Sequence, residues 1–474
     1  MTAPSNHSSI FKPYEDKSLI DLCQSQRDFF AMGKSKEVDF RIQTLKKLKR
    51  VVKDYEEAII EAVQKDLNKP RFEAYASEIG VVYDEINLAL KNLKSWSKPR
   101  RTSSPLTAFP SRSYIIPEPK GVCLIIGPWN YPFQLVIGPL IAALSAGNTA
   151  FVKPPEQCPH TAQLIGDMLG ANFDKELICV VQGEGHQVVP QLMNLFRFDH
   201  IFFTGSIPVG KSIAQKAAED LIPVTLELGG KSPCIIDESA NLKVAARRIA
   251  FGKWLNAGQT CIAPDYLLVK REVWDLFREE LIATIKSFYP QGAIDSDSYT
   301  SIVNEKRYQT LKSYLNQGEL LLGGEFDDHR LRIAPTLLLF PDLKSPVMQE
   351  EIFGPILAIH LYDFDEDAKE IIAQNPNPLA FYIFSENKKA QEKWLGELSF
   401  GNGMVNNTVL QFANPSLPFG GIGDSGMGNA HGKFGFDTFS HHKAIMKSGT
   451  WLDPQQKYPP YSKLLYKLIR WLMS

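Results

Sequence analysis

Hydrophobic residues between positions 121 and 229 come in short continuous runs, separated by segments with the three- to four-residue rhythm of helices. Continuous apolar strands alternating with helices are typical of a parallel sheet that helices cover on both faces. We therefore predict a doubly wound α/β domain here. The expected strands are GVCLIIGP (121–128), NTAFVKP (148–154), LICVVQGE (177–184), HIFFTGS (200–206) and PVTLELG (223–229). The expected helices are 133–146, 161–169, 188–195 and 211–221.

The same alternation returns after residue 264 and predicts a second α/β domain. A chain of 474 residues exceeds the size at which a single core usually stops growing, so two domains fit its length. The expected strands are DYLLVK (265–270), ELLLGG (319–324), PTLLLF (335–340), PILAIHLY (355–362) and LAFYIFS (379–385), with a helix around 273–288.

The first hundred residues have a helical pattern instead. Between 38 and 67, apolar residues recur at helical spacing with Lys and Arg between them, which is typical of a region that packs and supports rather than one that catalyses. Pro99, Pro105 and Pro110 then break the pattern in a Ser/Thr-rich stretch, and 111–116 is expected to be extended.

The last fourteen residues, YSKLLYKLIRWLMS, predict an amphipathic helix. One face carries Tyr461, Leu464, Leu465, Leu468, Ile469 and Leu472, and the other carries Lys463, Lys467 and Arg470. Such a helix usually buries its apolar stripe against its own domain. A basic amphipathic helix also fits a membrane surface, although this one is too short to span a bilayer.

Composition narrows the function classes. Acidic and basic side chains nearly cancel, at net charge −1, which argues against nucleic acid as the main partner. The N-terminus lacks the apolar core of a secretory signal, and no run approaches the roughly 18 apolar residues of a membrane span. Six scattered cysteines without a CxxC pair indicate reduced thiols, so we expect a cytoplasmic protein. His441 and His442 lack neighbouring metal-ligand residues, so no metal site is expected.

Polar and glycine residues gather where the predicted strands of the first domain end. Asn130 follows the first strand, Lys153 lies at the end of the second, Gly205 and Ser206 lie at the end of the fourth, and Glu227 lies at the end of the fifth. Because ligands of doubly wound sheets bind at the carboxyl ends of strands, we expect a binding site along this edge.

Cys261 lies further along the chain, after a helical segment. An ionised thiol is a strong nucleophile, and a carboxylate such as Glu227 can activate water as a general base. Gly229 and Gly230 keep the backbone open beside that carboxylate. Alone, a cysteine is more often a small core residue and a glutamate is usually solvated. It is the contexts LELGGKSP and GQTCIAPDY that make the pair specific.

Two glycine motifs allow other interpretations. GSIPVGKS, residues 205–212, satisfies the P-loop pattern of a nucleotide triphosphatase. Pro208 counts against that function because it removes one N–H from the array that would hold the phosphates. A helix N-terminus after this turn can still bind a pyrophosphate. GIGDSG, residues 421–426, matches GxGxxG but follows no apolar strand, so we expect a turn.

From residue 41 to residue 442 the chain resembles the aldehyde dehydrogenase superfamily. The motifs that carry the resemblance are GPWNYP (127–132), FVKPPE (151–156), FTGS (203–206), LELGGKSP (226–233), GQTCIAPDY (258–266), EEIFGP (350–355) and LPFGG (417–421). HGKFGFDTFSHH (431–442), together with the short N-terminal region, resembles the class 3 branch of fatty and aromatic aldehyde dehydrogenases.

The resemblance implies oxidation of an aldehyde to a carboxylic acid through a cysteine thiohemiacetal and a thioester. It implies Cys261 as the nucleophile and Glu227 as the base that activates water. The side-chain amide of Asn130 and the backbone N–H of Cys261 would stabilise the oxyanion. A semialdehyde or CoA-acylating dehydrogenase of the same superfamily would keep the thiol but differ in its pocket.

The resemblance also implies NAD or NADP as the cofactor. The cofactor-binding residues that it implies are Lys153, Glu156, Gly205, Ser206, Gly210, Leu228, Glu351 and Phe353. Glu156 would repel a 2′-phosphate, which favours NAD, while NADP stays possible because class 3 relatives often accept both. Pro155 departs from the common KPSE motif.

The predicted organisation has two doubly wound parallel-sheet domains, a Rossmann-like cofactor domain and a catalytic thiol domain, with a small β oligomerisation arm. The NAD(P)-binding domain comprises 1–98 with 121–226, the catalytic domain 227–415, the arm 99–120 with 416–446, and the tail 447–474. The resemblance implies a homodimer and an aliphatic medium- or long-chain or aromatic aldehyde. In fatty-aldehyde relatives a helix at the position of the tail lies over the substrate entrance.

Overall fold

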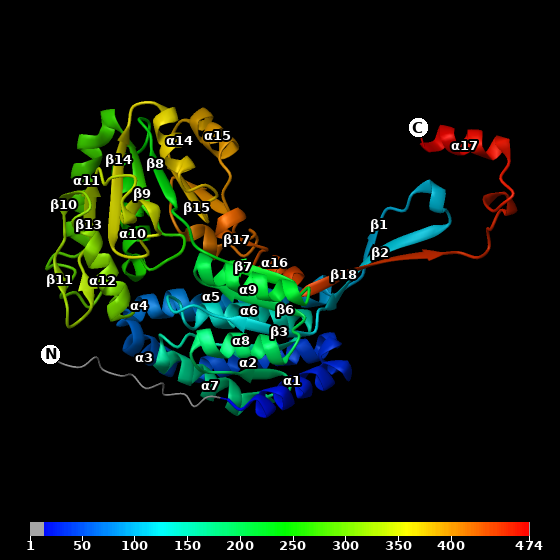
Figure 1. Cartoon of the computed structure of the whole chain (residues 1–474). Helices are drawn as coiled ribbons and strands as arrows, with labels where there is room; N and C mark the ends of the chain where they lie inside the picture. Colours follow the sequence, from blue (N-terminus) through cyan, green and yellow to red (C-terminus); the bar gives the residue numbers. More distant parts are fainter. Residues whose placement is uncertain (1–13, 474) are drawn as a thin grey trace.

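Two parallel β-sheets and a projecting β-arm organise the chain (Figure 1). The computed structural model describes residues 14–473. In Figure 1 the first sheet and the N-terminal helices lie below the second sheet. An antiparallel arm of β1 (Arg100–Thr102), β2 (Ser111–Pro119) and β18 (Ser440–Ser448) extends away from both.

The first sheet is doubly wound, as predicted. Its order is β17 (Gly426–Met427), β7 (Val224–Glu227), β6 (His200–Thr204), β3 (Val122–Ile126), β4 (Thr149–Lys153) and β5 (Ile178–Val180). All pairs are parallel except β17 with β7. Side chains of β3 alternate between two cores, with Cys123 and Ile125 in one and Val122 and Leu124 in the other.

Helices cover both faces of this sheet. They are α1 (Asp16–Ala31), α2 (Val38–Asp54), α3 (Glu56–Leu67), α4 (Arg71–Ala74), the π-helix η2 (Tyr75–Gly80), α5 (Val81–Trp96), α6 (Gln134–Ala146), α7 (Pro159–Asn172), α8 (Gly185–Leu195) and α9 (Ile207–Glu219). Helices α2, α3, α5, α6 and α7 contribute to one core, and α1, α8 and α9 contribute to the other.

The helices 134–146, 159–172, 185–195 and 207–219 differ from their predicted ranges by up to four residues at an end, and the helical region 38–67 is interrupted. The helical region 38–67 is divided at Tyr55, whose φ of −103° and ψ of 7° separate α2 from α3. Helix α9 begins at Ile207 rather than at 211, so Pro208 lies in the first turn. Proline is tolerated there because the first N–H groups of a helix have no intrahelical acceptor.

The second sheet is also mainly parallel. Its order is β10 (Glu319–Leu322), β13 (Thr336–Leu339), β14 (Ile356–Tyr362), β9 (Tyr266–Lys270), β8 (Pro233–Ile236), β15 (Ala380–Phe384) and β16 (Asn402–Val405). Only β10 pairs antiparallel. Its helices are α10 (Leu242–Trp254), α11 (Trp274–Phe288), α12 (Glu305–Tyr314), α13 (Pro346–Gln349), α14 (Asp365–Ala373) and α15 (Lys388–Glu397). The chain passes from β7 to β8 through residues 228–232, so Glu227 lies where one sheet gives way to the other.

Short elements complete the described chain. They are η1 (Lys34–Lys36), η3 (Leu106–Ala108), η4 (Leu255–Gly258), η5 (Arg271–Val273), η6 (Leu410–Ala413), η7 (Gly423–Ser425), η8 (Gln455–Lys457) and the hairpin of β11 (Phe326–Asp327) with β12 (Arg332–Ile333).

The segment 416–446 is shared between the first sheet and the arm. Strand β17 extends the first sheet beyond β7, and α16 (Gly432–Thr438) packs on α5 and α6. Strand β18 then pairs with β2 along its whole length, from Ser440 opposite Pro119 to Ser448 opposite Ser111. This pairing holds the two arm segments together although they are far apart in the sequence.

The tail forms helix α17 (Lys463–Met473) at the far end of the arm, away from both sheets (Figure 1). The interpretation that this helix packs on its own domain is therefore wrong for this structure. Leu464 and Tyr466 are 79% and 67% exposed. Among residues 14–473, no helix combines the length and the apolar character that crossing a bilayer requires.

Candidate active site

Cys261 and Glu227 line the same cavity, of about 320 Å³, between the two sheets. Glu227 is the last residue of β7 and is buried, while Cys261 follows η4 and is partly buried. Within the described chain, neither carboxyl oxygen of Glu227 has a hydrogen-bond partner. A buried carboxyl group without a partner is costly, so its presence beside a cavity indicates a reactive or binding role.

The cavity makes both groups hard to ionise. Burial raises the pKa of the Cys261 thiol, and the carboxylates of Glu351 and Glu227 raise it further. Burial also raises the pKa of the Glu227 carboxyl well above its usual range. A carboxylate in such surroundings is a stronger base than one in water.

Asn130 lies beside the loop that carries Cys261. Its buried side-chain amide donates a hydrogen bond to the carbonyl of Gln259, with 3.0 Å between Nδ2 and O. The neighbouring Tyr131 hydroxyl lies 2.7 Å from the Thr260 hydroxyl. The loop after β3 and the loop before β9 therefore contact each other at two consecutive positions.

Glu351 approaches the same place from the second sheet. The backbone N–H of Gly230 donates to its carboxylate, and a Cβ atom added at Gly229 would lie 2.1 Å from Glu351 Oε2. Burial raises the pKa of Glu351 to about 8, with a further contribution from the carboxylate of Asp265. Phe353 has a positive φ of 45°, and its ring lies 5.2 Å from that of Trp129, edge to face. A positive φ in a bulky residue is strained and is common at functional sites.

Lys153 and Glu156 form a largely buried ion pair at the end of β4. The first backbone N–H of α8, from Gly185, also donates to Glu156, with 3.1 Å between N and Oε1. Burial raises the pKa of Glu156, but the ammonium of Lys153 and these hydrogen bonds outweigh that effect, so the net pKa is lowered. Glu156 is therefore ionised at neutral pH.

The remaining predicted cofactor residues surround the N-terminus of α9. Gly205 follows β6, Ser206 is the N-cap, and Gly210 lies in the first turn. A Cβ atom at Gly210 would lie 2.6 Å from the side chain of Leu228, so this glycine lets the helix pack against the segment after Glu227. Exposed N–H groups at a helix N-terminus can bind a phosphate group.

Two residues of the P-loop-like and GxGxxG-like motifs, Lys211 and Gly426, have structural contacts that explain them. Lys211, the P-loop lysine of the rival interpretation, is exposed and pairs with Asp424 at 3.0 Å. Gly426, in the GxGxxG match, has a φ of 147°, and a Cβ atom there would lie 2.2 Å from the carbonyl oxygen of Leu226. The glycine thus allows β17 to pair closely with β7. No cluster of metal-ligating side chains occurs among residues 14–473.

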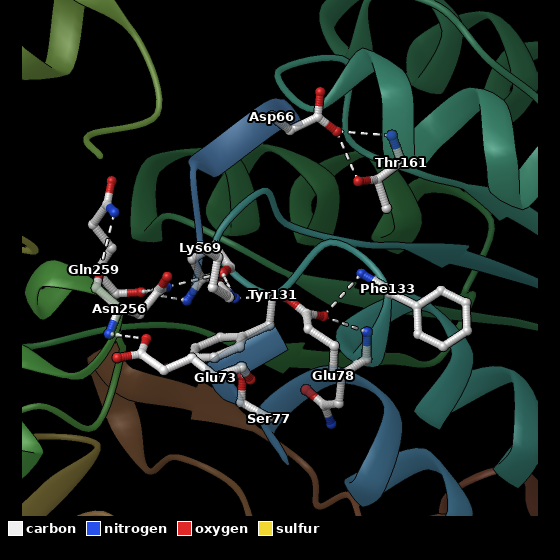
Figure 2. Close-up of polar contacts among 12 residues, drawn as sticks. Asp66, Lys69, Glu73, Ser77, Glu78, Tyr131, Phe133, Thr161, Asn256 and Gln259 are labelled. Atoms are coloured by element: carbon white, nitrogen blue, oxygen red, sulfur yellow. Dashed lines mark hydrogen bonds and ion pairs between the residues drawn. The ribbon is translucent and has the colours of Figure 1, made fainter. Parts of the chain in front are cut away.

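A polar network that the sequence did not predict lies on the N-terminal side of the site (Figure 2). Lys69 and Glu78, from the region expected only to support, form an ion pair next to Asn130. Asn256 and Gln259 belong to the same network. The sequence held no signal for them, because charged residues are usually exposed and only the structure shows that Lys69 and Glu78 are buried.

A solved structure with the same fold indicates the class of protein to which this chain belongs. A substrate-bound structure of Staphylococcus aureus AldH superposes with a TM-score of 0.92 at 46% sequence identity, covering 96% of this chain and 99% of that one. Two relatives with similar sequences are also named as aldehyde dehydrogenases. The 4,4'-diaponeurosporen-aldehyde dehydrogenase of Staphylococcus aureus is 48% identical over 91% of this chain and 94% of its own length. Aldehyde dehydrogenase family 3 member A2 of Rattus norvegicus is 42% identical over 93% of this chain and 91% of its own length.

The aldehyde dehydrogenase family profile matches residues 17–445. The chain belongs to the aldehyde dehydrogenase family, and its similarity to family 3 relatives agrees with the class 3 resemblance of the sequence. It is an oxidoreductase that oxidises aldehydes with NAD or NADP. The nucleotide triphosphatase and CoA-acylating alternatives are not favoured.

Proposed function

We propose that Cys261 is the nucleophile of aldehyde oxidation and that Glu227 is its general base. The observation that carries the proposal is the shared cavity, into which Glu227 brings a carboxyl group with no hydrogen-bond partner in the described chain. The sulfur of Cys261 adds to the aldehyde carbon, and the thiol proton passes to a base. The product is a tetrahedral thiohemiacetal with a negatively charged oxygen.

Asn130 is the proposed oxyanion donor. An amide nitrogen carries two N–H groups, and one of them is committed to the carbonyl of Gln259. We assign the second N–H, together with the backbone N–H of Cys261, to the oxyanion. The bond to Gln259 fixes the amide plane before substrate arrives, which avoids reorganisation during the reaction.

Glu227 then acts on the thioester that remains on Cys261 after oxidation. Its carboxylate removes a proton from water, and the water oxygen adds to the thioester carbon. The carboxylic acid leaves and the thiol is regenerated. The apolar surroundings favour this step because they keep the basicity of the carboxylate high.

The residues present fit a dinucleotide. Glu156, held by Lys153 and Gly185, is proposed to bind a ribose diol, and Glu351, which lies against Gly229, is proposed to bind the second ribose. The pyrophosphate would lie at the N-terminus of α9 beside Ser206, Gly210 and Leu228, and the ring of Phe353 would lie against the nicotinamide end. A bound oxidised nicotinamide supplies the hydride acceptor and a positive charge that favours the anionic forms of Cys261 and Glu227.

The substrate class follows from the cavity lining, which is mainly apolar. Phe72, Leu135, Phe251 and Phe412 belong to it. Such a lining favours medium- or long-chain aliphatic or aromatic aldehydes over charged semialdehydes, because burying a charge without a partner is costly. The Staphylococcus aureus relative is named for a diaponeurosporen-aldehyde, which agrees with an apolar substrate.

The test compares reduction of NAD and of NADP by hexanal, a longer aldehyde, benzaldehyde and a charged semialdehyde, followed by near-ultraviolet absorbance. Cys261→Ala should abolish reduction with every substrate. Glu227→Gln should allow one rapid turnover and then stop at the thioester, which mass spectrometry detects as a mass increase on the peptide containing Cys261. Undiminished turnover in either variant would refute its assigned role, and a preference for the semialdehyde would refute the substrate class.

We propose that the arm is the interface of a homodimer. Leu106, Phe109 and Trp451 are 84%, 62% and 72% exposed, and the rings of Phe109 and Trp451 contact each other edge to face. Large exposed apolar side chains at one end of an arm favour association with a second copy. Sedimentation should give a dimer mass for the full chain and a monomer mass for Leu106→Asp/Phe109→Asp. A monomeric full chain would contradict the proposal.

The exposed helix α17 supports a proposal of peripheral membrane contact. Leu464 and Ile469 are exposed on a helix that also carries Lys463, Lys467 and Arg470. An apolar stripe beside basic residues fits an anionic bilayer surface. The full chain should sediment with anionic vesicles, and a chain ending at Lys457 should not. Equal sedimentation of the two would end this proposal.

A further inference from the structure

A fully buried ion pair of Lys69 and Glu78 lies beside Tyr131 and Asn256 (Figure 2) and is hydrogen-bonded to the backbone of Asn130. Lys69 Nζ is 2.7 Å from Glu78 Oε1, and neither side chain is exposed to solvent. A buried pair often adds little net stability compared with apolar residues of similar size, because both charges lose their hydration. The position of this pair, rather than its stability, therefore requires an explanation.

Lys69 directly contacts the loop after β3 that carries Asn130. Its Nζ donates a second hydrogen bond to the backbone carbonyl of Asn130, at 3.2 Å, and lies 4.2 Å from the centre of the Tyr131 ring. The Asn130 carbonyl also accepts a hydrogen bond from Asn256 Nδ2, at 2.9 Å. Asn256 Nδ2 donates in turn to the carbonyl of Gln259, at 3.0 Å, which also accepts the side-chain amide of Asn130. The result is a closed network that includes both loops.

Glu78 holds the other end of the same segment. Its second carboxyl oxygen accepts backbone N–H groups of Phe133 and Gln134, at 3.1 and 2.9 Å, where α6 begins. Glu78 lies on the π-helix η2, a rare conformation that often occurs at functional sites. The pair thus fixes residues 130–134 at both ends.

The loop on the cysteine side needs such support. Asn256 and Ala257 both have positive φ values, of 54° and 51°. Left-handed conformations of non-glycine residues persist only where surrounding contacts hold them. The network supplies contacts to this loop only two to five residues before Cys261.

We propose that Lys69 and Glu78 are positioning residues for the oxyanion site. They hold the side-chain amide of Asn130 in the orientation that meets the oxygen of the thiohemiacetal on Cys261. The proposal rests on the role assigned above to Asn130. Neither charged residue touches the substrate; each acts through the backbone of residues 130–134.

The experiment is a double-mutant cycle with Lys69→Met and Asn130→Ala. Methionine keeps about the length of the apolar part of the lysine side chain but removes the ammonium group, with its charge and its donors. Lys69→Met should lower kcat by about 10- to 100-fold, because small displacements of a catalytic group cost this much. The KM for NAD should stay within about twofold of the wild-type value. In the Asn130→Ala background the same substitution should lower kcat by less than about threefold, because two residues that act through one group are not additive.

The controls separate positioning from general loss of structure. Lys69→Arg, which keeps charge and donors, should recover at least part of kcat. Lys49→Met removes a half-buried lysine that bonds to Asn87, and it should leave kcat unchanged. Titration of Cys261 with iodoacetamide gives the fraction of intact sites, so that kcat is expressed per intact site.

The outcomes are distinct. A kcat per intact site within about twofold of wild type in Lys69→Met would overturn the proposal, as would an equal loss in both backgrounds. If Asn130→Ala alone leaves kcat unchanged, the oxyanion role of Asn130 fails, and the positioning proposal fails with it. If Lys69→Met does not fold, Lys69→Met/Glu78→Gln removes both charges together, and the same two criteria apply to that double variant.

Discussion

The carboxylate of Glu351 lies against Gly229, two residues after Glu227, in the space that a larger side chain at position 229 would occupy. An added Cβ atom would lie 2.1 Å from Oε2 and 2.6 Å from Cδ of Glu351. The glycine therefore leaves room for the Glu351 carboxylate, to which we assigned the second ribose of the cofactor in our proposal.

Gly229→Ala should displace Glu351 and weaken cofactor binding. We expect the KM for NAD to rise by about tenfold, which corresponds to the loss of roughly one charge-assisted hydrogen bond. Gly170→Ala is the matched control, because this helical glycine of α7 has no atom within 4 Å of an added Cβ. Steady-state kinetics at varied NAD measure both. An unchanged KM in Gly229→Ala would show that Glu351 does not contact the cofactor.

Cofactor binding should depend on pH through Glu351. Its pKa is raised to about 8, so the group gains a proton as the pH falls below that value and becomes a carboxylate as the pH rises above it. A carboxylate accepts ribose hydroxyl groups more strongly than a carboxylic acid does. The dissociation constant for NAD should therefore decrease as the pH rises through about 8, and Glu351→Gln should remove this step. Fluorescence titration in the absence of aldehyde measures it, and a step that persists in Glu351→Gln would assign it to another group.

Glu156→Gln should change the preference between the two cofactors. The ionised carboxylate repels a 2′-phosphate and accepts the ribose diol, so its neutral replacement should raise the NADP-to-NAD ratio of kcat/KM by about tenfold. Glu184→Gln is the matched control, because Glu184 is the N-cap of α8, directly before Gly185, and its side chain is 40% exposed. If wild type, Glu156→Gln and Glu184→Gln have equal NADP-to-NAD ratios, the 2′-hydroxyl of the cofactor's ribose does not bind at Glu156.

Glu227→Gln should stabilise the fold while it abolishes steady-state turnover. The folded-state pKa of Glu227 is raised, so its contribution to stability is present below the ordinary pKa of 4.5 and is lost as the pH rises towards the folded-state value. The variant should gain about 1 kcal/mol in unfolding free energy at neutral pH, and the gain should vanish near pH 4. Urea denaturation at several pH values tests this. A variant less stable than wild type at neutral pH would show that the carboxyl group has a stabilising partner.

Much of this architecture could be predicted from local sequence. The apolar runs 122–126 and 200–204 became parallel strands because strands buried on both faces need continuous apolar residues. Cys261 and Glu227 could be proposed as site residues because their short motifs are specific. Those residues then meet at one cavity because β7 and β9 belong to adjoining sheets.

The rest could not be predicted because it depends on contacts between distant residues. Nothing near Lys69 in the sequence shows that its ammonium bonds to the carbonyl of Asn130, 61 positions away. The same holds for the positive φ of Asn256, which only the surrounding network maintains. The break at Tyr55 was hidden because apolar residues keep their helical spacing on both sides of it.

Strands β7 and β17 pair with each other although they are synthesised at different times. Gly426 pairs with Glu227, so the strand that ends at the proposed base waits for a partner made about 200 residues later. At translation rates of about 5–20 residues per second, this interval is about 10–40 s. If the rest of the first sheet forms during synthesis, the edge of β7 that faces β17 has no partner for that time. Strand β17 therefore completes the first sheet, and its pairing with β7 covers an edge that could otherwise pair with another chain.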